Sequence, residues 1–223
     1  AAQVVVEQAK EIAARLLEAD AADVVLNTES GDFHVAGTPA VTTSWADIAS
    51  AAGEAGLIEQ TTFQAPGATY PFGAHVAVVE VDRDTGLVKH LRHIACDDAG
   101  TMVNPMLLAG QVHGGVAQGT AQALYEEVRY DEDGNPVTSN LADYTMISAD
   151  LMPTIERIPM ETATWVNELG AKGIGESGTI GSTPAVHSAV VDALSHLGVR
   201  HIDMPCTPEK VWRAIAGVLS HAP

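Results

Sequence analysis

Apolar residues recur at helical spacing in several parts of the chain. Near the N-terminus, Val5, Ala9, Ile12 and Leu16 share one face and charged side chains take the other. Ser, Thr or Pro ahead of such segments, and Gly behind them, mark helix ends. The pattern predicts helices over residues 2–19, over 45–52 between Ser44 and Gly53, over 107–127, from Ser182 or Thr183 through Pro184 to Gly198, and from Thr207 and Pro208 onward with Val211, Ile215, Val218 and Leu219 buried.

Alternating apolar residues between turn signals predict two hairpins. One joins residues 24–28 to 33–36, and the other joins 74–82 to 87–95 as an antiparallel pair around the turn 84–86. In the second hairpin the apolar face shifts between Val78 and Val79. A further turn, 131–135, is expected between short strands. No internal repeat is visible, so the predicted fold class is α+β, with mixed sheets and helices.

Length and charge narrow the classes of function. The 223 residues suffice for a buried core, and 46% of them are hydrophobic, as in globular proteins. The formal net charge of −18 gives the chain a field that repels polyphosphates and anionic lipids. Nucleic acid and membrane surfaces are therefore not expected as partners.

The cysteines exclude a self-contained metal cluster. Cys96 and Cys206 lie far apart in the sequence, with no Cys or His beside them at ligand spacing. Any zinc ribbon or iron–sulfur cluster must then belong to another chain. With no long apolar run and no signal-peptide pattern, we expect a cytoplasmic protein.

A glycine-rich segment at residues 171–181 surrounds a single carboxylate, Glu176, ahead of a predicted helix. Such a loop can bring peptide N–H groups to an anion and leave the glutamate projecting from bare backbone. The alternative is a flexible surface loop with a solvated glutamate. The segment fits neither the Walker loop nor the dinucleotide-binding pattern.

The predicted helix 107–127 contains Gly110, Gly114, Gly115 and Gly119, each unfavourable in a helix interior. Something must approach that backbone closely. Gln111 could hydrogen-bond a large planar or phosphorylated ligand there, but for a glycine-rich helix taken by itself close helix–helix packing is the favoured explanation.

Five motifs occur in an order that is recognisable. They lie in residues 70–82, 96–105, 110–119, 172–176 and 203–212 and include Asn-Pro at 104–105, Gly-Gln-Val-His-Gly-Gly at 110–115 and Lys-Gly-Ile-Gly-Glu at 172–176. This series resembles the C-terminal portion of the molybdopterin-binding large subunit of the molybdenum hydroxylases, the family of xanthine dehydrogenase, aldehyde oxidase and carbon monoxide dehydrogenase. The resemblance covers essentially all of residues 1–223, which would be the last part of a cofactor-binding domain completed by another chain.

The resemblance implies a set of site residues. Glu176 would be the catalytic base, with a pKa raised by burial beside the anionic cofactor. No side chain would bind the metal, because the family's pterin holds the molybdenum. The residues implied to bind the cofactor, which we expect to be the cytosine dinucleotide form of molybdopterin, are Val103, Asn104, Leu107, Gln111, Lys172, Gly173, Ile174 and Gly175, the last four through main-chain N–H groups.

The resemblance also implies a larger assembly. Further partners would be an upstream molybdopterin-binding chain and subunits that carry 2Fe–2S clusters and FAD. The complex would hydroxylate an aldehyde or N-heterocycle with oxygen from water, while purines and carbon monoxide also remain open as substrates. Two alternatives are a non-catalytic structural subunit of such a complex and a small nucleotide-binding module.

Overall fold

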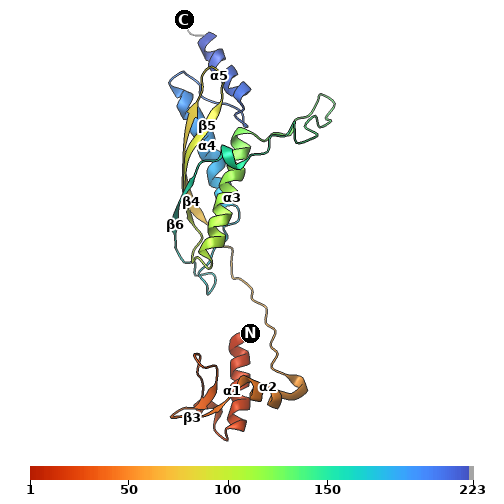
Figure 1. Cartoon of the computed structure of the whole chain (residues 1–223), viewed down its shortest axis with the longest axis vertical. Coiled ribbons are helices and arrows are strands. Elements are labelled where there is room, and N and C mark those ends of the chain that lie inside the picture. The colour runs from red at the N-terminus through yellow and green to blue at the C-terminus, as the bar shows by residue number, and fades with distance from the viewer. Residues whose placement is uncertain (221–223) are drawn as a thin grey trace. The chain divides into compact units, whose positions relative to one another are not determined.

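The structure is a computed structural model that describes residues 1–220, with side chains as far as residue 217 (Figure 1). The chain divides into two compact units, Ala1–Gln64 and Ala65–Pro223. The first unit contains α1 (Ala2–Leu16), η1 (Ala21–Asp23), β1 (Val24–Leu26), β2 (Phe33–Val35), β3 (Thr38–Thr43), α2 (Trp45–Ala52) and η2 (Gly53–Ala55). The second contains β4 (Phe72–Val81), β5 (Val88–Asp98), α3 (Pro105–Leu124), η3 (Ala149–Leu151), β6 (Ile155–Met160), α4 (Ser177–Ser195) and α5 (Pro208–Ser220).

The smaller unit packs two helices on an antiparallel sheet in the order β1-β2-β3. Its predicted hairpin and both predicted helices are confirmed. Ser44 and Asp47 form a capping box at α2, in which each side chain accepts a hydrogen bond from the other residue's N–H. Strand β3 was not predicted, because only Thr43 of its six residues is buried and no apolar alternation marks it.

The larger unit is built on a sheet in the order β4-β5-β6 (Figure 1). β4 and β5 form the predicted antiparallel hairpin, and the predicted shift of face is a bulge at Val78/Val79, opposite which Leu91 is the extra residue. The bulge places His90 and His93, three positions apart, on the same buried face. β6 runs parallel to β5 and was not predicted, because Pro159 and mixed polar residues obscure this edge strand.

Helices α3 and α4 pack against each other and against the sheet. Gly115 and Gly119 account for their close approach. A Cβ at Gly115 would come within 2.9 Å of Gly178 Cα, and one at Gly119 would collide with Ser182 Oγ. The packing explanation therefore holds for these two glycines.

The predicted start of α4 was wrong. The helix begins at Ser177 rather than after Ser182 or Thr183, and Pro184 lies inside it. A proline inside a helix removes one backbone hydrogen bond. Contacts of the first turns with α3, together with the hydrogen bond from Thr183 Oγ1 to the Thr179 carbonyl (3.0 Å), support this segment.

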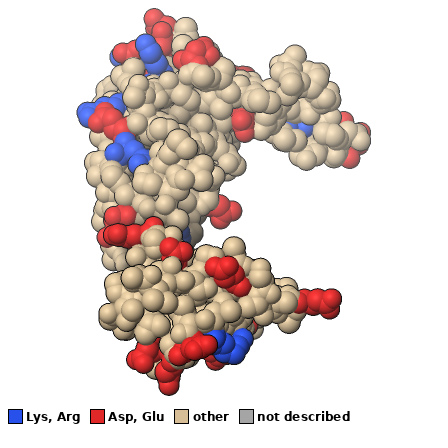
Figure 2. Space-filling model, turned by 60° about the horizontal axis from the view of Figure 1, so that its bottom comes forward, with Lys and Arg blue, Asp and Glu red and all other residues tan. Residues whose placement is uncertain are grey.

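The remaining predictions are largely confirmed. α5 begins at Pro208 and buries Val211 and Ile215, whereas Val218 and Leu219 lie outside the described side chains. The turn 131–135 forms, but a single bridge between Tyr130 and Pro136 takes the place of the expected strands. Within the described residues, no helix combines the length and apolar character needed to cross a membrane. Figure 2 shows many more acidic than basic groups on the visible surface, in keeping with the net charge.

Candidate functional site

The loop 172–176 is held at both ends by two consecutive aspartates at the end of β5. At its start, Lys172 Nζ donates a hydrogen bond to Asp98 Oδ1 (3.0 Å). Lys172 Nζ also lies 4.7 Å from the centre of the Phe72 ring. Just beyond its end, Ser177 Oγ donates to Asp97 Oδ1. Strand β5 thus fixes both ends of this glycine-rich segment.

The ion pair at the start of the loop is buried. The Lys172 side chain is 10% exposed and that of Asp98 is fully buried. Burial alone would raise the pKa of Asp98, but hydrogen bonds from Thr162, Gly100 and Lys172 outweigh it and lower the pKa to about 2. Asp98 is therefore a carboxylate at neutral pH and keeps Lys172 in place.

Asp97, at the other end, begins a chain of buried side chains. Its carboxylate lies 3.1 Å from His75 Nε2, His75 Nδ1 lies 3.1 Å from His93 Nε2, and His93 Nδ1 lies 3.3 Å from His90 Nε2. Burial opposes ionisation of Asp97, yet the hydrogen bonds from His75 and Ser177 leave its pKa lowered. This cluster was not predicted from the sequence.

The two buried histidines of β5 are neutral near pH 7. Burial lowers the pKa of His90 to about 4, partly opposed by an interaction with the Arg92 backbone. Burial and the neighbouring rings of His90 and His75 also lower the pKa of His93 to about 4. These two rings therefore add no charge to the core near pH 7.

Glu176 precedes the first residue of α4, and its carbonyl accepts the Ile180 N–H (2.9 Å). Its side chain makes no capping hydrogen bond and is exposed. The expected burial of this carboxylate is therefore not found within the described part of the chain. A small cavity of about 100 Å³ next to it is lined by Pro71, Phe72, Gly73, His75, Asp97, Ser177, Ile180 and Gly181.

The other loop residues that were predicted to bind the cofactor have different surroundings in the structure. The expectation that the Lys172 N–H is free for a ligand was wrong, because it donates to the Ala99 carbonyl (2.8 Å). Ile174 is half-buried against the cluster that contains Leu108 and Val112, which places the loop beside the first half of α3. Gly173 and Gly175 are exposed, and nothing lies within 4 Å of a Cβ built on either.

The candidates on α3 lie on its exposed side. Asn104 caps the helix, its Oδ1 accepting the Leu107 N–H (3.0 Å). Val103 and Leu107 are 69% and 63% exposed, and Gln111 is also exposed. Unlike Gly115 and Gly119, Gly110 and Gly114 face open space. Packing therefore explains only Gly115 and Gly119 among the four glycines of α3.

Among the described residues, no three His, Cys, Asp or Glu side chains are arranged to hold a metal ion. What the site offers is exposed backbone at glycines, one carboxylate without a capping bond, and a rigid support beneath it. These features suit a large ligand that is bound mainly through peptide groups, with Glu176 at its edge.

Comparison with known proteins identifies the class. Residues 1–153 match the family described as the molybdopterin cofactor-binding domain. The carbon monoxide dehydrogenase large chain of Hydrogenophaga pseudoflava is 39% identical over 96% of this chain and 27% of its own length. The 6-hydroxypseudooxynicotine dehydrogenase complex subunit gamma of Paenarthrobacter nicotinovorans is 36% identical over 98% of this chain and 28% of its own length.

A solved structure agrees with these relatives. Quinoline 2-oxidoreductase from Pseudomonas putida 86 matches all of this chain and 29% of its own chain, with a TM-score of 0.84 and 37% identity. The chain therefore belongs to the molybdopterin cofactor-binding domain family and has its α+β fold. It spans little more than a quarter of the length of these relatives.

Proposed function

We propose that this chain is the part of a molybdenum hydroxylase large subunit that supplies the glutamate base, Glu176, and one side of the molybdopterin site. The observation that carries the proposal is the combination of a free Glu176 side chain with firmly held surroundings. The Glu176 side chain is exposed and makes no capping bond, while Asp97 holds Ser177, the next residue, and Asp98 holds Lys172, four residues before it. A solvated surface glutamate needs no such support.

The residues present fit a large, anionic cofactor. Gly110, Gly114, Gly173 and Gly175 leave open space where side chains would stand, so that a flat ligand can lie against the backbone. Gln111 offers an amide at the same surface. The loop N–H groups and the N-terminus of α4 supply dipoles for a phosphate, which lets an acidic protein hold it at short range.

When bound, the cofactor supplies the redox chemistry. The residues of this chain bind and orient it, and Glu176 accepts a proton at its carboxylate. A general base works best with a pKa near the operating pH, and for a carboxyl group burial beside an anionic cofactor raises the pKa in that direction. Since this chain leaves Glu176 exposed, the rest of the protein has to close over it.

The finer parts of the proposal concern the whole protein. We assign a cytosine dinucleotide form of the cofactor, 2Fe–2S and FAD subunits as electron acceptors, an upstream cofactor-binding chain, and a cytoplasmic location. Two relatives are named for nitrogen-containing aromatic or related compounds and one for carbon monoxide. They support a small electron-poor substrate, and we favour an N-heterocycle or aldehyde.

The test is Glu176→Gln in the assembled, cofactor-loaded protein. The amide keeps the size of the side chain but cannot take the proton, so we expect normal molybdenum and pterin content with turnover reduced on the order of 10²–10⁴-fold or more. Glu132→Gln, the same change in an exposed turn, is the control and should keep wild-type turnover.

Three results would overturn the proposal. Turnover within a few-fold of wild type would remove Glu176 from the reaction. A wild-type protein that contains molybdopterin but shows no turnover would favour the non-catalytic structural subunit. A purified protein free of molybdenum and pterin would favour a nucleotide-binding module, which family membership makes the weaker alternative.

A further inference from the structure

Helix α4 begins one residue earlier than its sequence favours. Serine is among the preferred residues at a helix N-cap, the position just before the first helical residue, and glutamate is not. By that preference Ser177 would be the cap and Gly178 the first helical residue. In the structure Ser177 is already helical, and Glu176 takes the cap position with helical dihedral angles (φ −112°, ψ −9°) and no capping bond from its side chain. Another group therefore holds the Ser177 side chain.

That group is the buried carboxylate of Asp97, whose side chain is 4% exposed. Because Asp97 is ionised, it can only accept hydrogen bonds. Ser177 Oγ donates to its Oδ1, and His75 Nε2 donates from 3.1 Å to Oδ2 and lies 3.3 Å from Oδ1. The hydroxyl proton of Ser177 is thus committed to Asp97, and the His75 ring fixes the direction in which Asp97 points.

Two glycines make room for this buried pair. A Cβ at Gly181, inside α4, would stand 2.6 Å from Cδ2 of the His75 ring. A Cβ at Gly73, on β4, would stand 2.8 Å from Asp97 Oδ1. Glycine is unfavourable inside a helix, so at Gly181 the helix loses stability in order to admit the ring.

Contacts with α3 hold the next residues of α4. The backbone of Gly178 lies against that of Gly115, and Thr179 Oγ1 donates to the Gly115 carbonyl (3.1 Å). Glu176 lies just before this supported segment. The hydrogen bond of Ser177 to Asp97 is therefore the side-chain contact nearest to Glu176 along the helix.

We infer that the pair of His75 and Asp97 positions the proposed base, Glu176. By holding the Ser177 hydroxyl, the pair makes α4 begin at Ser177 and fixes the direction in which the Glu176 carboxylate leaves the helix. The inference rests on the proposed function, because it assigns a purpose to the position of Glu176. His75 acts only through Asp97 and Ser177, so it is a positioning residue and not a catalytic one.

Two variants of His75 test the inference in the assembled, cofactor-loaded protein. Gln and Met have similar lengths, but only Gln has an N–H donor at the position of Nε2. His75→Met should lower kcat for the N-heterocycle or aldehyde that the wild type oxidises on the order of 10–10²-fold, with KM and molybdopterin content unchanged. His75→Gln should recover most of the lost kcat. Equal kcat in the two variants, or wild-type kcat in His75→Met, would overturn the inference.

Ser177→Ala tests the same connection from its other end and removes only one hydroxyl group. It should lower kcat about as much as His75→Met does, and it decides the question even where His75→Met does not assemble. The double variant should have no lower kcat than Ser177→Ala, because His75 has no further effect once the hydroxyl is absent. Losses that multiply would mean that His75 acts by another route, and the inference would be wrong.

Amide hydrogen exchange gives a readout that does not depend on turnover. The Ile180 N–H donates to the Glu176 carbonyl (2.9 Å), a bond that requires the helix to begin at Ser177. We expect exchange at Ile180 to rise severalfold in His75→Met, although the two residues lie on different elements. Unchanged exchange at Ile180 would contradict the inference.

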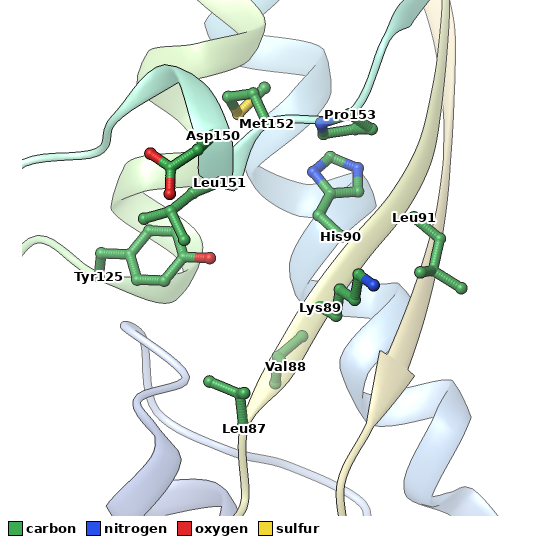
Figure 3. Close-up of a pocket in the computed structure, with 10 residues that line it drawn as sticks. All are labelled: Leu87, Val88, Lys89, His90, Leu91, Tyr125, Asp150, Leu151, Met152 and Pro153. Carbon is green, nitrogen blue, oxygen red and sulfur yellow. The ribbon is translucent and has the colours of Figure 1, made fainter.

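His90 provides the control, because it lies at the other end of the histidine cluster. Figure 3 shows it at a cavity that is also lined by Val88, Tyr125 and Leu151 and by no residue of the loop 172–176. His90→Met removes a similarly buried ring without touching Asp97, so kcat and the exchange at Ile180 should stay near their wild-type values. A loss of kcat as large as in His75→Met would indicate a general effect of disrupting the core and would overturn the inference.

The outcome for Glu176→Gln separates this inference from the proposed function. Wild-type turnover in Glu176→Gln would overturn the proposed function and this inference with it. An inactive Glu176→Gln together with wild-type kcat in Ser177→Ala would overturn this inference alone.

Discussion

At the scale of single residues, two neighbouring aspartates, Asp97 and Asp98, hold the two ends of the loop that carries Glu176. The sequence drew attention to Glu176 and its glycines as an isolated carboxylate in a glycine-rich segment, while its role as a base was implied by the family resemblance and stays a prediction. The anchors Asp97 and Asp98 were not identified from the sequence, since their partners Ser177 and Lys172 lie 80 and 74 positions further along the chain. No local pattern reveals a pairing that only the fold creates.

The ion pair between Lys172 and Asp98 gives a prediction at this scale. Lys172→Met keeps the apolar stem but leaves a buried carboxylate without its partner, which costs about 3–5 kcal/mol. We expect amide hydrogen exchange in residues 172–176 to rise by about 10²-fold or more in the assembled protein. Lys89→Met, at an exposed position of β5, is the control, and an unchanged exchange rate in Lys172→Met would show that the pair does not fix the loop.

At the scale of elements, the contact between α3 and α4 decides where the loop stands. Gly115 and Gly114 are sequence neighbours in opposite surroundings: a Cβ at Gly115 meets the backbone of α4, and one at Gly114 meets nothing within 4 Å. The sequence showed a helix rich in glycine but could not show which glycines face the partner helix, because that depends on how the two helices pack.

These two glycines form a matched pair of variants. Gly115→Ala should force the helices apart and lower stability by about 1–3 kcal/mol. Gly114→Ala should raise stability by about 0.5–1 kcal/mol, since alanine favours the helix. Melting temperatures of the full-length protein report both changes, and shifts of the same sign would contradict the packing described for α3 and α4.

The open glycine also tests the cofactor surface. If a flat ligand lies against α3, the methyl group of Gly114→Ala should lower the molybdopterin content of the purified protein while its melting temperature does not fall. Full cofactor content in this variant would place the ligand away from Gly114.

Elements that carry a complete local signal were predicted well. The hairpin of β4 and β5, with its bulge, has strong alternation and a clear turn, and α2 has a cap at its start and a glycine at its end. β3 and β6 lack such signals, since β3 is mostly exposed and β6 is an edge strand with Pro159. At α4, Pro184 was read as a first-turn residue although packing on α3 extends the helix before it.

At the scale of the whole molecule, the buried histidines make the larger unit sensitive to acid. His90 and His93 have pKa values of about 4, below the usual 6.5. The unfolded chain therefore binds protons that the folded protein excludes, and stability present above pH 6.5 is lost as the pH falls toward 4. Each ring contributes on the order of 3 kcal/mol to this loss.

The many carboxylates of an acidic chain also change its stability with pH. We therefore compare how steeply the melting temperature falls with pH in the wild type and in a variant of the cluster. Between pH 6.5 and 4.5, the melting temperature of the wild-type protein should fall by several degrees more than that of His93→Phe. His201→Phe should follow the wild type. Parallel curves for wild type and His93→Phe would mean that protonation of the cluster does not limit stability.

The central claim is that Glu176 lies at a molybdopterin cofactor which this chain only partly encloses. A structure of the complete, cofactor-loaded protein tests it most directly. We expect the Glu176 carboxylate to lie within hydrogen-bonding reach of the cofactor's metal centre, covered by parts of the protein outside this chain, with the pterin against the open glycines of α3 and the loop. A Glu176 side chain in bulk solvent, away from the cofactor, would contradict the account.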